Sequence, residues 1–251
     1  MPPRTDRPGD FGGLDGCRAG WVLASILAPG GDRGPAPTSR SRVEVGVVSS
    51  FAEAIARIHD RSLAALAIDM PIGLPESGAR AADQAARQRL GPRRSSVFPT
   101  PLRAVLDATD YPDALARSRA IHGRGLSKQA FNLLPKIIEV DAAMTPALQA
   151  QVVECHPEVA FARLAGGPLA TTKHAPVGRA QRAALLDPLL IGVDGSTIAE
   201  LAAAPPPGAK PDDVLDALVV ALTARRLAGG RAEHLGDRAR DARGLRMEIV
   251  V

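Results

Sequence analysis

The segment AALAIDMPIG (residues 64–73) is the stretch that decides the fold. Its first five residues are apolar without alternation, which is typical of a strand buried on both faces. Pro71 and Gly73 end the strand, because proline has no amide hydrogen to donate and glycine favours a turn. Asp69 follows the apolar run directly. We therefore expect a central strand of an α/β sheet with a carboxylate at its carboxyl end.

Upstream of this strand, the chain predicts three further strands and one helix. The apolar runs that predict strands are residues 11–16, 20–28 and 42–48. The third run alternates apolar and polar positions, as a half-exposed strand does. A helix is expected at residues 50–60, capped by Ser49 or Ser50. Residues 29–41, rich in glycine and proline, predict a surface loop, and residues 1–10 a disordered tail.

Downstream, residues 76–148 predict a helical insertion between two strands. Its expected helices are residues 79–90, 112–123 and 128–144, the last kinked or divided at Pro135. Beyond it we expect a strand at 151–155, helices at 157–166 and 180–190, a linker at 205–210, a long helix at 212–230 and a closing strand at 244–251. Three strands that can meander, followed by alternating helix and strand, predict an α/β protein with a mixed five-stranded sheet flanked by helices.

Length and composition favour one soluble domain at residues 11–251. A chain of 251 residues can grow a single core. No run approaches the roughly 18–20 apolar residues of a membrane span, and the N-terminus lacks the apolar segment of a secretion signal. We therefore expect a cytoplasmic protein with no membrane partner. Cys17 and Cys155 are too few for a disulfide framework and are expected in the core, with soft-metal binding as the alternative.

The net charge of +4 comes almost entirely from arginine. The lysines are Lys128, Lys136, Lys173 and Lys210. Arginine matches phosphate oxygens in two-point contacts, which favours an anionic substrate, although a composition bias of the genome would give the same excess. The aromatic residues are one Trp, one Tyr and five Phe, which argues against binding single strands by base stacking.

Acidic residues stand at or near the ends of apolar elements along the whole chain. They are Asp15, Asp69, Glu154, Asp213 and Asp216. Burying an unpaired carboxylate is costly, so several such acids together predict one divalent-metal site. Asp213 and Asp216 share a helix face because they are three residues apart, whereas Asp212 is expected to cap the helix. For any single acid, the alternative is a cap or turn residue.

Such a site suits phosphodiester cleavage. Two divalent ions about 3.5–4 Å apart activate water and hold the departing oxygen when carboxylates from different elements converge on them. Mg²⁺ or Mn²⁺ is expected, because such hard ions prefer oxygen ligands. Asp15 is expected to bridge the ions, with Asp69 on one side and Asp213 or Asp216 on the other.

Other polar residues are candidates for catalysis or substrate contact. Glu154 is expected in the catalytic site, unless it orients a loop or pairs with an arginine, and His156 is a candidate proton shuttle or a packed histidine. The substrate-binding candidates are Gln129 and Lys136 on one helix face with Asn132 and Glu139, then Arg93, Arg94, Ser95 and Ser96 in a turn-rich segment, and finally Lys173 and Arg182. Solvated polar surfaces are the alternative for the helix face and for the turn-rich segment.

Several segments resemble a known family. They are GLDGCRAGW (13–21), AIDMPIGLP (67–75), RRSSVFPTP (93–101), GLSKQAFNLLPKIIEVD (125–141), ECHPEVAFARLAG (154–166) and DDVLDALVVA (212–221). These runs resemble the family of predicted RNase H-like nucleases catalogued as domain of unknown function 429, in the family's order over about residues 11–229. The resemblance implies an RNase H-like fold, a metal-dependent nuclease and a nucleic-acid partner.

A fainter resemblance connects the chain with RuvC-type resolvases. Those enzymes carry an acid on the first strand, an acid after the fourth, a Glu-x-x-Pro-like segment and an Asp-x-x-Asp-Ala helix. The matching positions are Asp15, Asp69, residues 154–157, Asp213 and Asp216. Resolvases usually have Glu where this chain has the shorter Asp69. By analogy with them a homodimer is one arrangement, although no residue pattern here specifies it.

Three functions therefore compete at this point. The first is a Mg²⁺- or Mn²⁺-dependent nuclease acting on DNA or RNA. The second is a phosphotransferase or nucleotide hydrolase of the related actin-like fold, which normally needs two such domains and for which this chain is short. The third is a nucleic-acid-binding or regulatory protein that has kept the fold without activity. Fold alone does not decide among them, but the intact set of acids favours the first.

Overall fold

The computed structural model describes residues 9–28 and 40–251, and its centre is a six-stranded mixed sheet. The strands are β1 (Asp10–Cys17), β2 (Gly20–Ile26), β3 (Ser41–Val48), β4 (Leu63–Ile68), β5 (Val152–Glu154) and β6 (Leu190–Gly192), in the order β5-β4-β1-β2-β3-β6. β1, β2 and β3 form an antiparallel meander, and β4 runs parallel to β1. β5 is parallel to β4, and β6 to β3. Residues 1–8 of the expected tail and residues 29–39 of the expected loop lie outside the described residues. The tail was expected to reach residue 10, but β1 already begins at Asp10.

The sixth strand corrects the expectation of five. Residues 180–190 were expected as one helix, but helix α6 (Pro176–Leu186) ends earlier and β6 begins at Leu190. Pro188 separates the two elements, because proline does not continue a helix. A three-residue strand carries too little alternation to be distinguished from the end of an apolar helix.

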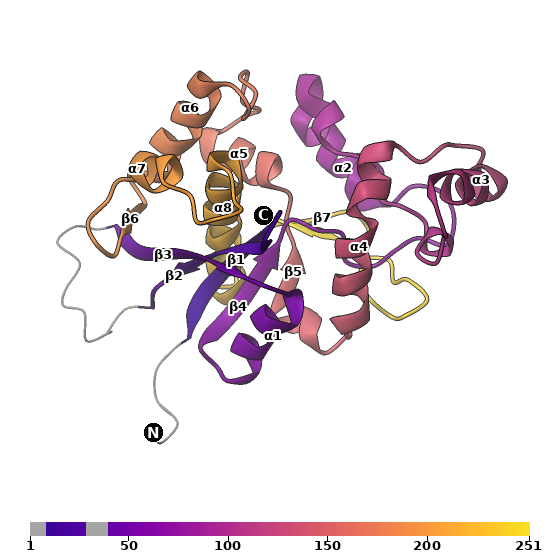
Figure 1. Cartoon of the computed structure of the whole chain (residues 1–251), viewed down its shortest axis with the longest axis horizontal. Helices are drawn as coiled ribbons and strands as arrows, with labels where there is room; N and C mark the ends of the chain where they lie inside the picture. The colour runs from indigo at the N-terminus through magenta and orange to yellow at the C-terminus, as the bar shows by residue number, and fades with distance from the viewer. Residues whose placement is uncertain (1–8, 29–39) are drawn as a thin grey trace.

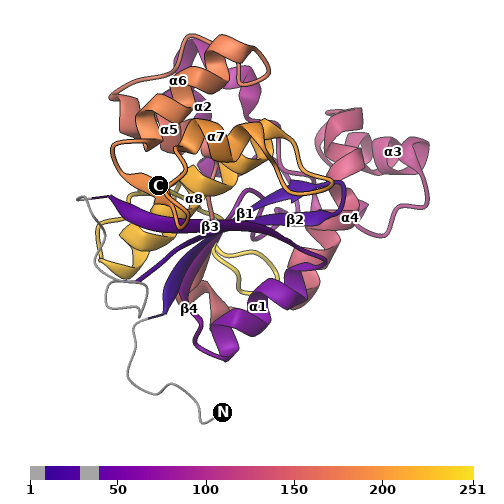
Figure 2. The ribbon, with the colours of Figure 1, turned by 60° about the vertical axis from the view of Figure 1, so that its left-hand side comes forward.

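Helices cover both faces of the sheet, as Figures 1 and 2 show. On one face lie α5 (Pro157–Ala165), α6, α7 (Ile198–Ala203) and α8 (Pro211–Ala228). On the other lies α1 (Phe51–His59), which is capped by Ser50 as expected and contacts α4 (Lys128–Ala143). Two hydrophobic clusters correspond to these two faces, and strand residues alternate between them. β4 is buried on both faces as predicted, with Leu66 in one cluster and Ala67 in the other.

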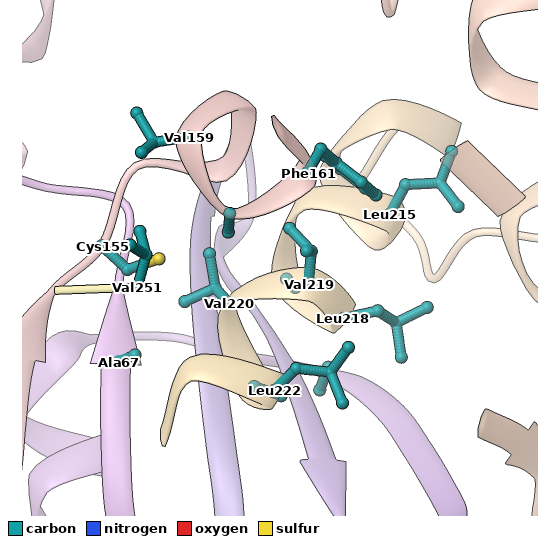
Figure 3. Close-up of a cluster of buried hydrophobic side chains, with 14 of the residues drawn as sticks. Ala67, Cys155, Val159, Phe161, Leu215, Leu218, Val219, Val220, Leu222 and Val251 are labelled. Atoms are coloured by element: carbon teal, nitrogen blue, oxygen red, sulfur yellow. The ribbon is translucent and has the colours of Figure 1, made fainter. Parts of the chain in front are cut away.

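Helix α8 is the central helix of the fold. Every residue from 214 to 224 is buried, and the helix packs across β1, β2 and β4. Figure 3 shows its Val219 and Val220 in the cluster that also contains Ala67 of β4 and Phe161 of α5. The approach to β1 is so close that a Cβ on Gly13 would lie 2.1 Å from the backbone oxygen of Ala217. Gly13 is therefore required for this packing, because a backbone atom cannot turn away as a side chain can.

The expected helical insertion lies between β4 and β5. It contains α2 (Ala81–Leu90), the 3-10 helices η1 (Gly91–Ser96), η2 (Arg103–Val105) and η3 (Leu148–Ala150), α3 (Tyr111–His122) and α4. In both views α3 lies at the edge of the molecule, away from the sheet. Pro135 stands inside α4 without dividing it.

The C-terminal strand exists but does not join the main sheet. β8 (Ile249–Val250) pairs with β7 (His234–Leu235) in a separate two-stranded antiparallel sheet. Among the described residues, no helix is both long and apolar enough to cross a membrane.

Candidate functional site

A cavity of about 440 Å³ lies at the carboxyl ends of β1, β4 and β5. The acids Asp15, Asp69, Asp213 and Glu154 line it, together with residues of η1, α4 and the start of α5. The carboxyl edge of parallel strands is where ligands bind in open α/β sheets. The sequence-predicted acids are thus brought to one place from distant segments.

Asp15 and Asp216 meet because β1 and α8 pack face to face. In β1, Leu14 belongs to the cluster beneath α1 and α4, so the next side chain, that of Asp15, lies on the α8 side. Asp216 comes from the buried stretch of α8 and has no exposed surface. The close approach at Gly13, two residues before Asp15 on the same face, sets the helix at this depth.

Mutual repulsion and burial act on these carboxyl groups together. Burial raises the pKa of Asp15 well above its usual value, and the charges of Asp69 and Asp216 raise it further. Burial also raises the pKa of Asp69, although His156 and Lys173 oppose that rise, and Asp69 is within hydrogen-bonding reach of Asp15. The pKa of Asp216 is raised by burial to about 6. Such raised pKa values arise when carboxyl groups are buried, and they rise further when several share one site.

Lys173 pairs directly with one of these acids. It precedes α6, and its Nζ donates to Oδ2 of Asp216 in a charge-assisted hydrogen bond. Burial alone would lower the pKa of Lys173, but Asp216, Asp15 and Asp69 hold it above its ordinary value. The ammonium group therefore stays charged and compensates part of the negative charge. The sequence suggested Lys173 as a phosphate contact but did not indicate this pairing.

The set of oxygen ligands suits a hard divalent cation, although the side chains are not arranged around one. Among residues 9–28 and 40–251, no group of three or more His, Cys, Asp or Glu side chains is placed to hold a metal ion. Oδ1 of Asp216, however, is buried without a hydrogen-bond partner in the described part of the chain. A buried carboxylate oxygen without a partner is costly. A divalent cation bound to Oδ1 would satisfy it, while Lys173 Nζ occupies the other oxygen, Oδ2.

Of the two acids at the start of α8, Asp213 both caps the helix and lines the cavity, so the cap expected at Asp212 is wrong. Asp213, not Asp212, makes the capping bond, because the backbone N–H of Lys210 donates to its Oδ2 at 2.8 Å. Asp213 also lines the cavity, and burial raises its pKa. Asp212 instead lies 3.3 Å from Nδ1 of His174.

Glu154 pairs with an arginine, which is the alternative considered for it. Nη2 of Arg80 donates to Oε1 at 2.6 Å and Nη1 donates to Oε2 at 2.7 Å. The backbone N–H of Ile72 also donates to Oε2, so Glu154 fixes the loop after β4. Arg80 also donates to Oδ1 of Asp83, and the backbone N–H of Thr100 donates to Oδ2 of Asp83. With both oxygens engaged, Glu154 is a structural residue of the cavity wall, and its expected catalytic role is not supported.

Two further substrate candidates occupy structural positions. Arg182 is fully buried and binds both oxygens of Glu158, so its expected phosphate contact is wrong. Nζ of Lys136 donates to the backbone oxygen of Gly20 at 2.6 Å and lies over the ring of Trp21, outside the cavity. Glu139, from the same helix face, accepts from Nε1 of Trp21. Of this stripe, only Gln129 lines the cavity.

The turn-rich segment forms another part of the wall. Arg93, Ser95 and Ser96 of η1 line the cavity with His156, whose Nε2 lies 3.3 Å from the backbone oxygen of Ser96. Arg94 is exposed and does not line it. Four of the predicted residues thus meet beside the acids, and Arg94 does not.

Both cysteines lie in the core as expected. Cys17 and Cys155 are free and buried, and burial raises the pKa of Cys155 to about 12. A thiol with such a pKa is neither a nucleophile nor a ready metal ligand at neutral pH.

Fold and site together define a mixed α/β protein with an acidic cavity at the carboxyl edge of its sheet. The chain belongs to the family described as "Protein of unknown function (DUF429)", whose model matches residues 13–241. No curated protein and no solved structure matches the chain.

Proposed function

We propose that the protein is a divalent-metal-dependent nuclease with an RNase H-like fold. The antiparallel meander joined to parallel β4 and β5, with acids on β1 and after β4, supports this fold. The sixth strand is then an addition to the edge of β3. Nucleic acid is the proposed partner and the cytoplasm the proposed location, in line with two free cysteines.

The single observation that carries the proposal is the shortage of positive charge around the acids. Asp15, Asp69 and Asp216 come from three separate segments, and within the described residues Lys173 is the lysine whose charge acts on all three. Oδ1 of Asp216, which has no hydrogen-bond partner among the described residues, is an oxygen available to bind a cation beside these acids. Buried charge that is left uncompensated destabilises a fold, and it is typically retained for function.

We assign Mg²⁺ or Mn²⁺ to Asp15, Asp69, Asp213 and Asp216. A divalent cation there supplies the charge that lowers the pKa of water and stabilises the negative charge developing on a phosphate. The chain's own residues hold that cation, exclude bulk water through the buried walls and orient the substrate from η1. With a cation held by these acids, Asp216 would no longer need the charge of Lys173, and this ammonium group would be available to contact the phosphate.

One observation favours a second function. Lys173 already pairs with Asp216, and the described side chains do not surround a metal ion. A protein that binds a phosphorylated ligand without cleaving it would need no more than this arrangement. The two functions differ in one measurable property, the dependence on Mg²⁺ or Mn²⁺.

The test is cleavage of labelled single-stranded, duplex, hybrid and branched DNA and RNA with each metal. We expect wild type to cut at least one substrate and Asp15→Asn and Asp69→Asn to lose at least 100-fold in rate while remaining folded. Asp212→Asn is the matched control, because this acid lies beside the site on α8 but pairs with His174. Equal cleavage by Asp15→Asn would remove the acids from the mechanism. Absence of all cleavage together with retained binding would favour the second function.

A further inference from the structure

Arg93 has a guanidinium group without a counter-charge in the wall of the acidic cavity. It comes from η1 and is half-buried. Within the described ranges it makes no hydrogen bond or ion pair through its side chain, and its Nε is buried without a partner. Two other arginines near this wall are engaged instead: Arg80 with Glu154 and Asp83, and Arg87 with the backbone oxygen of Val97. A half-buried guanidinium without an acceptor is costly, and an anionic ligand removes that cost.

His156 adds a second unengaged group beside Arg93. Its Nε2 faces the backbone oxygen of Ser96, which can only accept, so Nε2 carries the hydrogen. Its Nδ1 is buried and has no partner in the part of the chain that the structure describes. This ring lies near enough to Asp69 to lower that acid's pKa. The anion-binding wall therefore adjoins the acids within one cavity.

The hydroxyl groups of Ser95 and Ser96 complete this wall. Both residues line the cavity, and neither hydroxyl is used in a hydrogen bond to another described residue. Together with Arg93 they place three donor side chains in one wall, one more than the two non-bridging oxygens of an internal phosphodiester. A phosphate monoester has three such oxygens and up to two charges near neutral pH. Its remaining hydrogen can also meet a neutral Nδ1 of His156.

The volume of the cavity restricts the ligand further. About 440 Å³ lies within the range of small-molecule sites, roughly 300–1,000 Å³, and does not admit a duplex. A strand can enter only by its end or as a nucleotide turned out of its stack. A terminal phosphate held at Arg93 would lie in the same cavity as Asp69.

We propose that Arg93, Ser95, Ser96 and His156 form a subsite for a phosphate monoester. This inference deepens the proposed nuclease function, since it makes the protein act at a phosphorylated end or on a small phosphorylated molecule. Phosphate binding itself requires neither metal nor cleavage. The phosphate subsite can therefore be tested independently of the nuclease activity.

The first test is calorimetric titration without metal, using inorganic phosphate, adenosine 5′-monophosphate and adenosine. We expect wild type to bind the two phosphates but not adenosine. Arg93→Ala should weaken phosphate binding about 10- to 100-fold, as expected for loss of hydrogen bonds to a charged group. Arg94→Ala is the matched control, because this neighbour is exposed and outside the cavity, and it should bind as wild type does. No phosphate binding by wild type, or equal losses in both variants, would overturn the subsite.

A second test distinguishes the source of the phosphate and separates this inference from the nuclease proposal. Fluorescence anisotropy compares binding of oligonucleotides with 5′-phosphate, 3′-phosphate and hydroxyl ends to the Asp15→Asn protein. Tighter binding of a phosphorylated end, lost in Arg93→Ala, identifies a strand end as the ligand even when no cleavage occurs. Equal binding of all oligonucleotides, with tight binding of the mononucleotide, identifies a small molecule instead. Equal binding of every ligand by Arg93→Ala and wild type contradicts the proposal, and thermal unfolding shows that the variant is folded.

Discussion

Two groups of buried charges stand in the same cavity wall and differ in how they are compensated. Around Arg80, the guanidinium meets Glu154 and Asp83, and backbone groups satisfy the remaining oxygens. Around Asp15, three carboxyl groups share one ammonium group, and an oxygen of Asp216 has no partner among the residues that the structure describes. The first group is satisfied within the chain, whereas the second is satisfied only when something else binds.

This difference separates structural acids from functional ones. Glu154 and Asp69 both follow parallel strands at the same edge of the sheet, and the pKa of each is raised by burial. Position and pKa therefore do not distinguish them. Their partners do, because Arg80 engages both oxygens of Glu154. An acid at a strand end is a candidate ligand only when the structure leaves it an unused oxygen.

The largest expected effect comes from breaking the satisfied group. Arg80→Met keeps much of the apolar stem but leaves Glu154 and Asp83 buried without a cation. Removing one partner of a buried ion pair costs about 3–5 kcal/mol, so we expect the free energy of unfolding in urea to fall by that amount. Arg89→Met is the control, since its pair with Glu233 is exposed, and it should cost less than about 1 kcal/mol. A similar small loss for Arg80→Met would mean that its network contributes little.

The unsatisfied group predicts an intermediate effect with a pH dependence of unusual sign. The pKa of Asp216 is about 6 in the folded protein, above its unfolded value of 3.8, so folding favours the protonated form. Its stabilising contribution is complete below about pH 4 and is lost as the pH rises to about 6. At neutral pH the loss is on the order of 3 kcal/mol by the free energy of a pKa unit.

Urea unfolding of the metal-free protein at pH 4, 5, 6 and 7 measures this effect. The free energy of unfolding of Asp216→Asn should rise relative to that of wild type as the pH increases from 4 to 7, because asparagine does not ionise. Asp212→Asn, whose acid pairs with His174, should show no such gain. A constant difference between wild type and Asp216→Asn at every pH would exclude a raised pKa.

The smallest effect concerns the ammonium group that compensates the acids. Lys173→Met removes the positive charge that competes with a metal ion for Asp216. We expect the affinity for Mg²⁺ to rise about tenfold, as expected from removing a nearby like charge. Lys128→Met is the control. That lysine, on α4, lies over the ring of Tyr111 of α3 and does not line the cavity. Calorimetry of Mg²⁺ binding measures both variants, and a lower affinity in Lys173→Met would mean that Lys173 supports the metal site instead.

The sequence predicted those parts of the fold and site that depend on local patterns. The apolar run at β4, the cap of α1 and the buried α8 follow from periodicity and propensity. Asp15, Asp69 and Asp216 were found because a carboxylate inside or after an apolar run is unusual. The apolar residues next to each acid in the chain were therefore enough to identify it as a candidate.

Features that depend on distant partners were not predictable in this way. Arg80 is buried because it pairs with Glu154, and no residue near Arg80 in the sequence indicates this pair. Arg182 was expected to contact phosphate. Its partner Glu158 lies on another helix, so no nearby residue indicates the pair. The strand β6 is defined by its hydrogen bonds to β3 and not by its own three residues.

The buried position of α8 has a consequence for the synthesis of the chain. β1 leaves the ribosome early and α8 late, yet the cluster needs Asp15 from the first and Asp216 from the second. Contacts between segments so far apart in sequence form late in folding. A nascent chain therefore carries no complete site until its last long helix has docked against Gly13. Any activity of this site is thereby withheld from incomplete polypeptides.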